Sequence, residues 1–273
     1  MTKLPKTTTI ELDDSQDGWL TIWLNRPDFK NALSEDMLDE LFEILAILHK
    51  DNKKRGVTFR GRGGVFCSGG DLKVFEQMTQ VGDKARGMAH KMSVVAGNFF
   101  KLIHTLPQIT VAVVEGSAMA GGFGLACATD FIVARKDAKM ALTEVLIGLT
   151  PAQIAPYVIQ RIGFQKTRQL MLLAKMTGGE DALKMGLADF ISNDEKEMND
   201  QVEKIKRSVL KGGPSALRST KKMIEAVRVL EQEKLIPFAA DLFADCLVSD
   251  EGKEGYGSFL EKRKPDWMRV IKS

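Results

Sequence analysis

Short apolar segments recur up to about residue 190, and most have the length and composition of buried or half-buried strands. Strands are predicted at residues 8–12, 20–24, 57–59 and 109–114, with further short ones at 131–134 and 140–142. Turn-forming residues separate the first two strands, which predicts a hairpin-like start. The chain therefore opens as a strand-rich core.

Between these strands the apolar spacing changes to that of helices. Ser34 is a predicted N-cap, and the helix after it has one apolar face, formed by Met37, Leu38, Leu41, Phe42, Leu45 and Leu48. Further helices are predicted up to Ile103 and after Pro151. Beyond about residue 190 mostly helical periodicity remains, punctuated by glycines. We therefore predict an α/β core in residues 1–193 and a helical region in residues 194–273.

Composition narrows the class of protein. The chain has 273 residues, and 44% of them are apolar, which is enough for a sizeable core. Its 39 basic and 36 acidic residues are intermixed, so no nucleic-acid partner is expected. No apolar run approaches the about 20 residues of a membrane span, and the start lacks a secretory signal pattern. With three cysteines and no C-x-x-C pair, we expect a cytoplasmic protein without a membrane partner.

Two glycine-bearing segments carry the most chemical information. Residues 66–72 read Phe-Cys-Ser-Gly-Gly-Asp-Leu, and residues 116–124 read Gly-Ser-Ala-Met-Ala-Gly-Gly-Phe-Gly. Each follows a predicted strand and opens a predicted helix, so each can direct free backbone N–H groups at a developing negative charge. Glycine pairs often mark tight turns only, but two in matching contexts favour an oxyanion site. Neither segment has the spacing of a dinucleotide or phosphate loop.

Histidine and cysteine give weaker signals. His49, His90 and His104 lack a metal-ligand spacing such as H-E-x-x-H, so no metal site is expected. Cys67 and Cys127 lie in apolar motifs without a paired histidine, which favours buried core thiols over nucleophiles.

The motifs taken together resemble the crotonase (enoyl-CoA hydratase/isomerase) family over nearly the whole chain. The matching stretches are Asn-Arg-Pro at 25–27, Asn-Ala-Leu at 31–33, residues 66–73, Val-Glu-Gly at 114–116 leading through Gly121 and Gly122 to Asp130, residues 144–151, and Ser-Phe-Leu-Glu-Lys-Arg-Lys-Pro at 258–265. The resemblance implies an α/β spiral of β-β-α turns with a C-terminal helical trimerisation region. It also implies an acyl-CoA substrate, no separate cofactor, and a homotrimer or a homohexamer built as a dimer of trimers.

The same resemblance assigns the catalytic positions. Gly70 and Gly121 match the residues whose backbone N–H groups hold the thioester oxygen, and Glu144 matches the catalytic glutamate. Taken alone, Glu144 would be interpreted as a solvated loop residue. A carboxylate beside a bound thioester can take a proton from water or from substrate carbon, and partial burial would raise its pKa.

Five further positions are implied to contact coenzyme A. Ser68 and Leu72 match residues whose main chain contacts the adenine. Lys73, Phe259 and Lys262 match positions near the nucleotide, the last two offered by a neighbouring subunit. A surface lysine is ordinarily a solvated charge, so these lysines depend on the resemblance.

Departures from the family pattern bear on the reaction. Gly124 stands where two-glutamate hydratases carry their second acid, and Ala120 and residues 152–155 (Ala-Gln-Ile-Ala) replace glycines that are common in the family. A single carboxylate suits an isomerase, which shuttles one proton between two carbons. Residues 121–127, 143–149 and 151–158 resemble instead the branched glutaconyl-CoA hydratases, which act on isohexenylglutaconyl-CoA or 3-methylglutaconyl-CoA and pair a glycine with one glutamate.

We therefore expect a hydro-lyase that adds water to the α,β-double bond of an enoyl-CoA, with a branched or glutaconyl-type acyl group. An enoyl-CoA isomerase and a non-catalytic CoA- or RNA-binding scaffold are the alternatives. A glutaconyl group carries a second carboxylate, which needs a cationic or hydrogen-bonding partner. Gln153, Arg161 and Lys91 are the candidates for that partner.

Overall fold

The computed structural model describes residues 4–15 and 17–269. The described residues fall into two compact units, one of residues 4–15 and 19–202 and the other of residues 17–18 and 203–269. This division falls inside helix α7 (Glu195–Lys211), whereas the predicted boundary between residues 193 and 194 precedes that helix. The predicted boundary stays a prediction.

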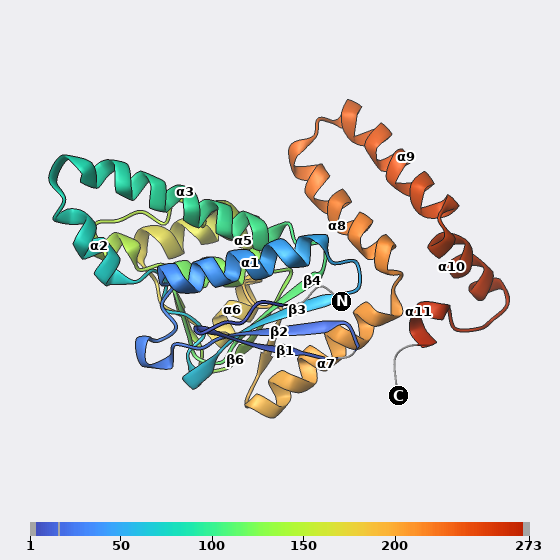
Figure 1. The fold of residues 1–273 in the computed structure, drawn as a ribbon, viewed down its shortest axis with the longest axis horizontal. Coiled ribbons are helices and arrows are strands. Elements are labelled where there is room, and N and C mark those ends of the chain that lie inside the picture. The colour runs from blue at the N-terminus through green and yellow to red at the C-terminus, as the bar shows by residue number, and fades with distance from the viewer. Residues whose placement is uncertain (1–3, 16, 270–273) are drawn as a thin grey trace. The chain divides into compact units, whose positions relative to one another are not determined.

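Over the described residues, the first unit is built on a six-stranded sheet (Figure 1). Its strand order is β1 (Ile10–Asp14), β2 (Trp19–Leu24), β3 (Gly56–Gly61), β4 (Ile109–Val114), β6 (Phe131–Arg135) and β9 (Phe190–Ser192). The pair β1 and β2 is antiparallel, as the hairpin-like start predicts, and the other neighbouring pairs are parallel. Strands β3 and β4 are buried along their whole lengths, which is typical of central parallel strands.

A second, three-stranded sheet carries the segment that leads to the candidate site. It contains β5 (Ser117–Met119), β7 (Lys139–Ala141) and β8 (Thr177–Gly178). Strands β5 and β7 pair in parallel, and β8 pairs antiparallel with β7.

Each predicted strand agrees with the structure to within two residues at either end. Strand β4 has the predicted bounds, and β2 begins one residue earlier than predicted. Strand β1 begins two residues later than predicted. Strands β5, β8 and β9 were not predicted, because apolar patterning is weak over two or three residues; among the strands this short only β7 was predicted.

Helices complete the first unit. They are α1 (Glu35–Lys50), α2 (Leu72–Thr79), α3 (Ala85–His104), α4 (Gly121–Ala128), α5 (Ala155–Leu173), α6 (Gly179–Met185) and the first part of α7, with short 3-10 helices η1 (Pro27–Phe29), η2 (Arg62–Gly64), η3 (Gly82–Lys84) and η4 (Glu144–Ile147). Figure 1 shows α1, α3 and α5 together on one side of the six-stranded sheet.

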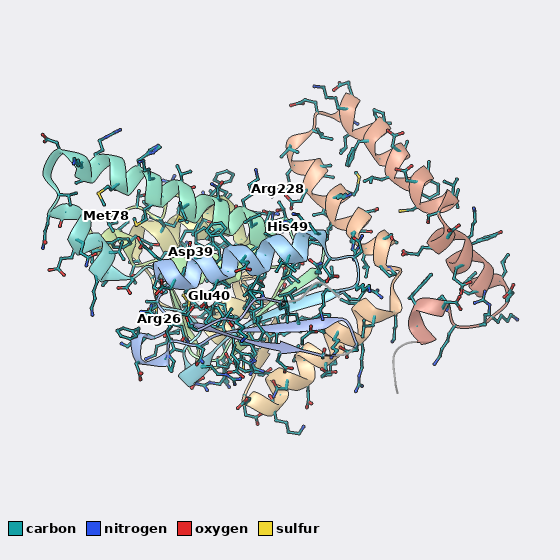
Figure 2. The ribbon with its side chains drawn as sticks, in the orientation of Figure 1. Arg26, Asp39, Glu40, His49, Met78 and Arg228 are labelled. Atoms are coloured by element: carbon teal, nitrogen blue, oxygen red, sulfur yellow. The ribbon has the colours of Figure 1, made fainter. Side chains whose placement is uncertain are left out.

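Helix α1 illustrates how local chemistry positions an element. Ser34 caps it, since its hydroxyl oxygen accepts a hydrogen bond from Met37 N at 3.3 Å. Its buried face contains Met37, Leu41, Ile44, Leu45 and Leu48, which confirms most of the predicted face. The carboxylate of Glu40 (Figure 2) accepts hydrogen bonds from the amides and hydroxyls of Thr8 and Thr9, and so ties the start of the chain to this helix.

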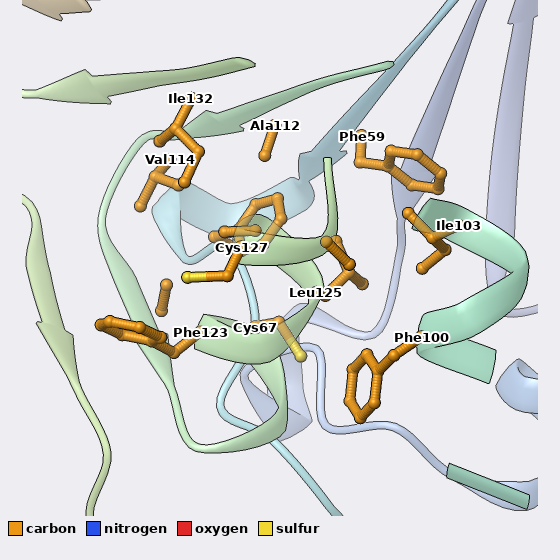
Figure 3. Packing of buried hydrophobic residues seen from close by; sticks show 14 of the residues in the cluster. Phe59, Cys67, Phe100, Ile103, Ala112, Val114, Phe123, Leu125, Cys127 and Ile132 are labelled. Carbon is orange, nitrogen blue, oxygen red and sulfur yellow. The ribbon is translucent and has the colours of Figure 1, made fainter. Parts of the chain in front are cut away.

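Helix α4 runs through the hydrophobic core. Every residue from 122 to 128 is buried. Figure 3 shows its side chains among residues of other elements: Phe123, Leu125 and Cys127 lie with Phe59, Cys67, Phe100, Ile103, Ala112, Val114 and Ile132. The helix start is therefore fixed by packing along the rest of its length.

The second unit is helical in its described part. It contains the end of α7, then α8 (Pro214–Val229), α9 (Gln232–Val248), α10 (Asp250–Leu260) and α11 (Asp266–Arg269). Large apolar side chains are exposed on it, namely Ile224, Val227, Val229, Ile236, Phe243, Leu247, Val248, Tyr256, Phe259 and Leu260.

Candidate active site

The two glycine-bearing segments lie next to each other in the fold. A parallel bridge pairs Cys67 with Ala118, and Met119 N donates to Cys67 O at 2.9 Å. Phe66 N and Cys67 N donate to Ser117 O at 3.1 and 3.2 Å. These backbone hydrogen bonds hold the segment that follows β3 against the segment that follows β4.

Gly70 and Gly121 present backbone amides that bond to no described residue. Gly70 precedes Asp71, the N-cap of α2, and Gly121 is the first residue of α4. A β-carbon at position 121 would lie 3.7 Å from Gly70 N, so both amides border the same space. Since N–H groups at a helix start lack acceptors within the helix, this pair is suited to hold an oxyanion.

Two neighbouring glycines allow this close approach. Gly69 has a φ of 97°, a conformation that side chains disfavour. A β-carbon at Gly122 would overlap Cys67 O and lie 2.7 Å from Cys67 C, and such backbone atoms cannot move aside. A β-carbon at Gly121, in contrast, meets contacts of 3.5 Å and longer. Backbone conformation therefore favours glycine at position 69, and packing requires it at position 122. Packing does not require glycine at position 121.

Glu144 is placed by the small sheet. It begins η4, three residues beyond the end of β7. Strand β7 pairs in parallel with β5, so that Met119 lies opposite Ala141, and Ala120 N donates to Ala141 O at 2.9 Å. Parallel strands end at the same sheet edge, and Glu144 and Gly121 therefore leave the sheet on the same side.

The carboxyl group of Glu144 is partly withdrawn from water. Its Oε2 atom is buried and has no hydrogen-bond partner among the described residues. Desolvation by this burial raises the pKa of Glu144 above its usual value. Because burial disfavours the charged form, this carboxylate is a stronger base than a solvated one.

Position 124 is closed by apolar side chains. Gly124 lies one helical turn beyond Gly121. A β-carbon there would overlap Ile154 Cγ2, and would lie 2.8 Å from Ile154 Cβ and 3.4 Å from Phe100 Cε1. Ile154 itself is 3% exposed. The site therefore has Glu144 on one segment and no room for a second side chain at 124.

Comparison with known sequences decides the family. Residues 14–269 match the family model described as enoyl-CoA hydratase/isomerase. This chain belongs to that family. A putative enoyl-CoA hydratase of Thermus thermophilus is 32% identical over 246 residues, which cover 89% of this chain and 95% of the relative. The predicted family is confirmed, as is the prediction of an enzyme of the enoyl-CoA hydratase type.

A solved structure and a second relative agree with this assignment. Pseudomonas aeruginosa AtuE is 36% identical and has a TM-score of 0.91, with 96% of this chain and 100% of that chain covered. This enoyl-CoA hydratase/isomerase family member therefore has the predicted crotonase fold. A mitochondrial methylglutaconyl-CoA hydratase of Mus musculus is 29% identical, with 93% of this chain and 81% of that protein covered.

Two residues that support the Gly70 segment were not assigned a role from the sequence. Asn31 Nδ2 donates to Arg62 O at 2.9 Å and to Val65 O at 2.7 Å, and its Oδ1 accepts from Arg26 N at 2.9 Å. Arg26 (Figure 2) lies 3.6 Å from the carboxylate of Asp71, the N-cap that follows Gly70. Both residues lie in sequence motifs, Asn-Arg-Pro and Asn-Ala-Leu, that indicated the family but not these supporting contacts.

The structure places the predicted CoA-contacting residues in both units. Ser68 N donates to Lys30 O at 3.0 Å, and Leu72 is 63% exposed at the start of α2. Lys73 Nζ lies 5.7 Å from the centre of the Phe29 ring, a cation–π distance. Phe259 and Lys262 belong to the second unit and are exposed. Their contacts with coenzyme A stay predictions.

Two of the three cysteines, Cys67 and Cys127, are core residues, as predicted. Cys67 and Cys127 are buried (Figure 3), and desolvation raises the pKa of each thiol to about 12. Neither thiol therefore ionises near neutral pH, and nucleophilic thiolate chemistry is excluded for both.

Arg161 makes hydrogen bonds within the protein and is therefore not placed to bind a substrate carboxylate. Its guanidinium donates to Asp189 at 3.0 Å, to Asp130 O at 3.2 Å and to Thr129 O. Gln153 and Lys91 stay the candidates for a distal carboxylate partner.

The described residues offer neither a metal cluster nor a membrane span. Within the described ranges no group of three His, Cys, Asp or Glu side chains is arranged to hold a metal ion. No helix in the described part of the chain is both long and apolar enough to cross a membrane.

Ala120 is strained at the entrance to α4. Its φ of 47° and ψ of −120° lie in a region that suits glycine. We expect Ala120→Gly to raise the free energy of unfolding by about 1 kcal/mol, since relief of strain exceeds the added chain entropy. Urea unfolding measures this change. The control is Ala244→Gly on the exposed side of α9, which should lose about 1 kcal/mol through helix propensity. If Ala120→Gly and Ala244→Gly lowered the free energy of unfolding equally, the backbone of Ala120 would not be strained.

Proposed function

We propose that this enzyme adds water to the α,β-double bond of an enoyl-CoA thioester. The observation that carries the proposal is a pair of acceptor-free amides, at Gly70 and Gly121, beside the segment that bears the desolvated Glu144. Addition of water to the β-carbon moves negative charge onto the thioester oxygen. Each amide donor that meets this oxygen is worth about 3–4 kcal/mol in the transition state.

Glu144 is the proposed acid and base. Its carboxylate takes a proton from water while the water oxygen bonds to the β-carbon, and the π electrons of the double bond move through the α-carbon to the thioester oxygen. Gly70 and Gly121 hold the resulting enolate. Glu144 then returns this proton to the α-carbon and the carbonyl reforms, so the net change is one added water and Glu144 is again a carboxylate.

The proposed acyl group is branched and of the glutaconyl type. Support comes from the methylglutaconyl-CoA hydratase of Mus musculus, at 29% identity, and from the replacement of glycines by Gln153 and Ile154 near the acyl end. Larger side chains there reshape the pocket. The CoA portion is proposed to meet Ser68, Leu72 and Lys73.

Isomerisation of the double bond is the second candidate, because one carboxylate suffices to move a proton between two carbons. The test incubates the protein with crotonyl-CoA, 3-methylglutaconyl-CoA and isohexenylglutaconyl-CoA in oxygen-18 water, followed by mass spectrometry. We expect the glutaconyl substrates to gain one labelled water. Conversion without a mass gain would establish isomerisation instead. No conversion of any substrate would contradict both activities and revive the non-catalytic CoA- or RNA-binding scaffold.

Assembly, cofactor and location complete the proposal. We propose a trimer or a dimer of trimers, because the second unit exposes large apolar side chains such as Val229 and Phe243. Sedimentation analysis tests this, and a stable monomer would contradict it. No cofactor beyond the CoA of the substrate is proposed. Three free thiols suit the reducing cytoplasm, which is the proposed location.

A further inference from the structure

Two departures from the family's sequence pattern, Gly124 in place of an acid and Ile154 in place of a glycine, meet in space. Position 124 lacks a side chain, and position 154 has gained one. The side chain of Ile154 occupies the space that a side chain at position 124 would need, because a β-carbon at Gly124 would overlap Ile154 Cγ2. Phe100 Cε1 closes the same point from α3, at 3.4 Å. The two departures are therefore one structural change.

The neighbouring residue repeats this arrangement on another helix. A β-carbon at Gly97 of α3 would overlap Gln153 Oε1 and lie 2.9 Å from Gln153 Cδ. Gln153 Nε2 donates to Ser93 Oγ on the same helix at 3.0 Å. Consecutive side chains thus occupy glycine gaps on α3 and α4, and they anchor the turn that runs from Glu144 to α5.

We infer that Ile154 is the positioning residue that restricts this site to one carboxylate, by occupying the volume that an acidic side chain at position 124 would need. The inference rests on the proposed hydration. With the second acid excluded, Glu144 takes the proton from water, and no other carboxylic acid on α4 returns one.

A one-carboxylate site has a distinct pH profile. The value of kcat/KM should rise through the pKa of Glu144, which burial has raised, as the base form appears. At higher pH kcat/KM should not fall again, because the site has no second carboxylic acid whose deprotonation would lower it. In a site with an added acid at position 124, kcat/KM should rise with pH as Glu144 loses its proton and fall at higher pH as the added acid loses its own, because the added acid must be protonated to act.

The test compares Gly124→Glu, Ile154→Gly and the double variant in hydration of the best wild-type substrate. Glycine is needed at 154, because an alanine would keep a β-carbon 2.8 Å from the one at 124. The matched control is Gly87→Glu, at an exposed position where an added β-carbon meets nothing within 4 Å.

We expect Gly124→Glu to lower kcat/KM at least about tenfold and the double variant to regain at least about tenfold, with a new falling limb in its pH profile. The Gly87→Glu control should keep the wild-type profile. Wild-type activity in Gly124→Glu would overturn the inference. So would a double variant that is no better than Gly124→Glu.

A second measurement covers variants that fail to fold. Melting temperatures of Gly124→Ala, Ile154→Gly and their combination should be non-additive, with a smaller drop from Gly124→Ala when Ile154 is absent. Additive drops would overturn the packing and the inference with it. A wild-type protein that hydrates none of the substrates overturns the proposed function instead, and the melting series still decides whether Ile154 fills position 124.

Discussion

Replacement of Glu144 by glutamine is expected to lower kcat for hydration by about 10²–10⁴-fold while binding of CoA esters persists. Glutamine keeps the size of the side chain but cannot take a proton from water. Loss of the enoyl-thioester absorbance measures kcat, and calorimetry with a saturated acyl-CoA measures binding. The control is Glu180→Gln, at an exposed residue paired with Lys136, which should hydrate normally. Unchanged hydration by Glu144→Gln would remove Glu144 from the mechanism.

The same variant should not lose stability at neutral pH. Desolvation raises the folded-state pKa of Glu144, so the folded state favours the protonated form. This contribution to stability is full below the unfolded-state pKa and is lost as pH rises through the folded-state pKa. At about pH 8 the melting temperature of Glu144→Gln should therefore equal or exceed that of the wild type. At about pH 5 the difference between the two melting temperatures should be smaller. A lower melting temperature at about pH 8 would contradict the desolvation.

Replacement of Arg60 by methionine is expected to lower the free energy of unfolding by about 3–5 kcal/mol. Arg60 and Glu115 form a buried ion pair with side chains 9% and 10% exposed, and Arg60 Nη2 lies 2.5 Å from Glu115 Oε1. Arg60 Nη1 also donates to Asn199 at 2.7 Å. Without the guanidinium the glutamate is left buried without a counter-charge. Urea unfolding measures the loss.

The neighbouring Arg62 provides the matched control. Both guanidinium groups stack on Trp23, at 4.4 Å for Arg60 and 3.7 Å for Arg62. Arg62 pairs with Glu11 at the surface, so Arg62→Met should cost about 0–1 kcal/mol. Equal losses in the two variants would contradict the importance of burial.

The Arg60→Met defect should depend on pH. Desolvation raises the pKa of Glu115 even with Arg60 in place, and removal of Arg60 should raise it further. The penalty for a buried charge disappears when that charge is neutralised. The destabilisation should therefore shrink as pH falls and Glu115 becomes protonated, and the double variant Arg60→Met/Glu115→Gln should recover most of the loss at neutral pH.

The sequence was most informative where the signal is local. The capped α1 and the buried β4 follow from spacing within a single segment. The position of Gly121 at a helix start follows in the same way from strand, glycine and helix signals in order, although β5 intervenes unpredicted. The roles of Gly70, Gly121 and Glu144 came from resemblance to the family and are still to be tested.

The remainder depends on contacts between distant segments. Asn31 supports the loop before Gly70 through carbonyl groups of residues 62 and 65, and no spacing in the sequence indicates this. The contact of Ile154 with Gly124 is also invisible in either segment alone. Both substitutions were visible as departures from the family, but only the fold shows that one fills the space left by the other.

The glycine gaps occupied by Gln153 and Ile154 also constrain how this lineage can change. A side chain regained at position 124 meets Ile154, and loss of Ile154 alone opens a cavity against Phe100. Either single step is unfavourable, so the two positions are epistatic. Across homologous sequences, a glutamate at 124 should co-vary with glycine at 154, and ancestral intermediates should change both positions together.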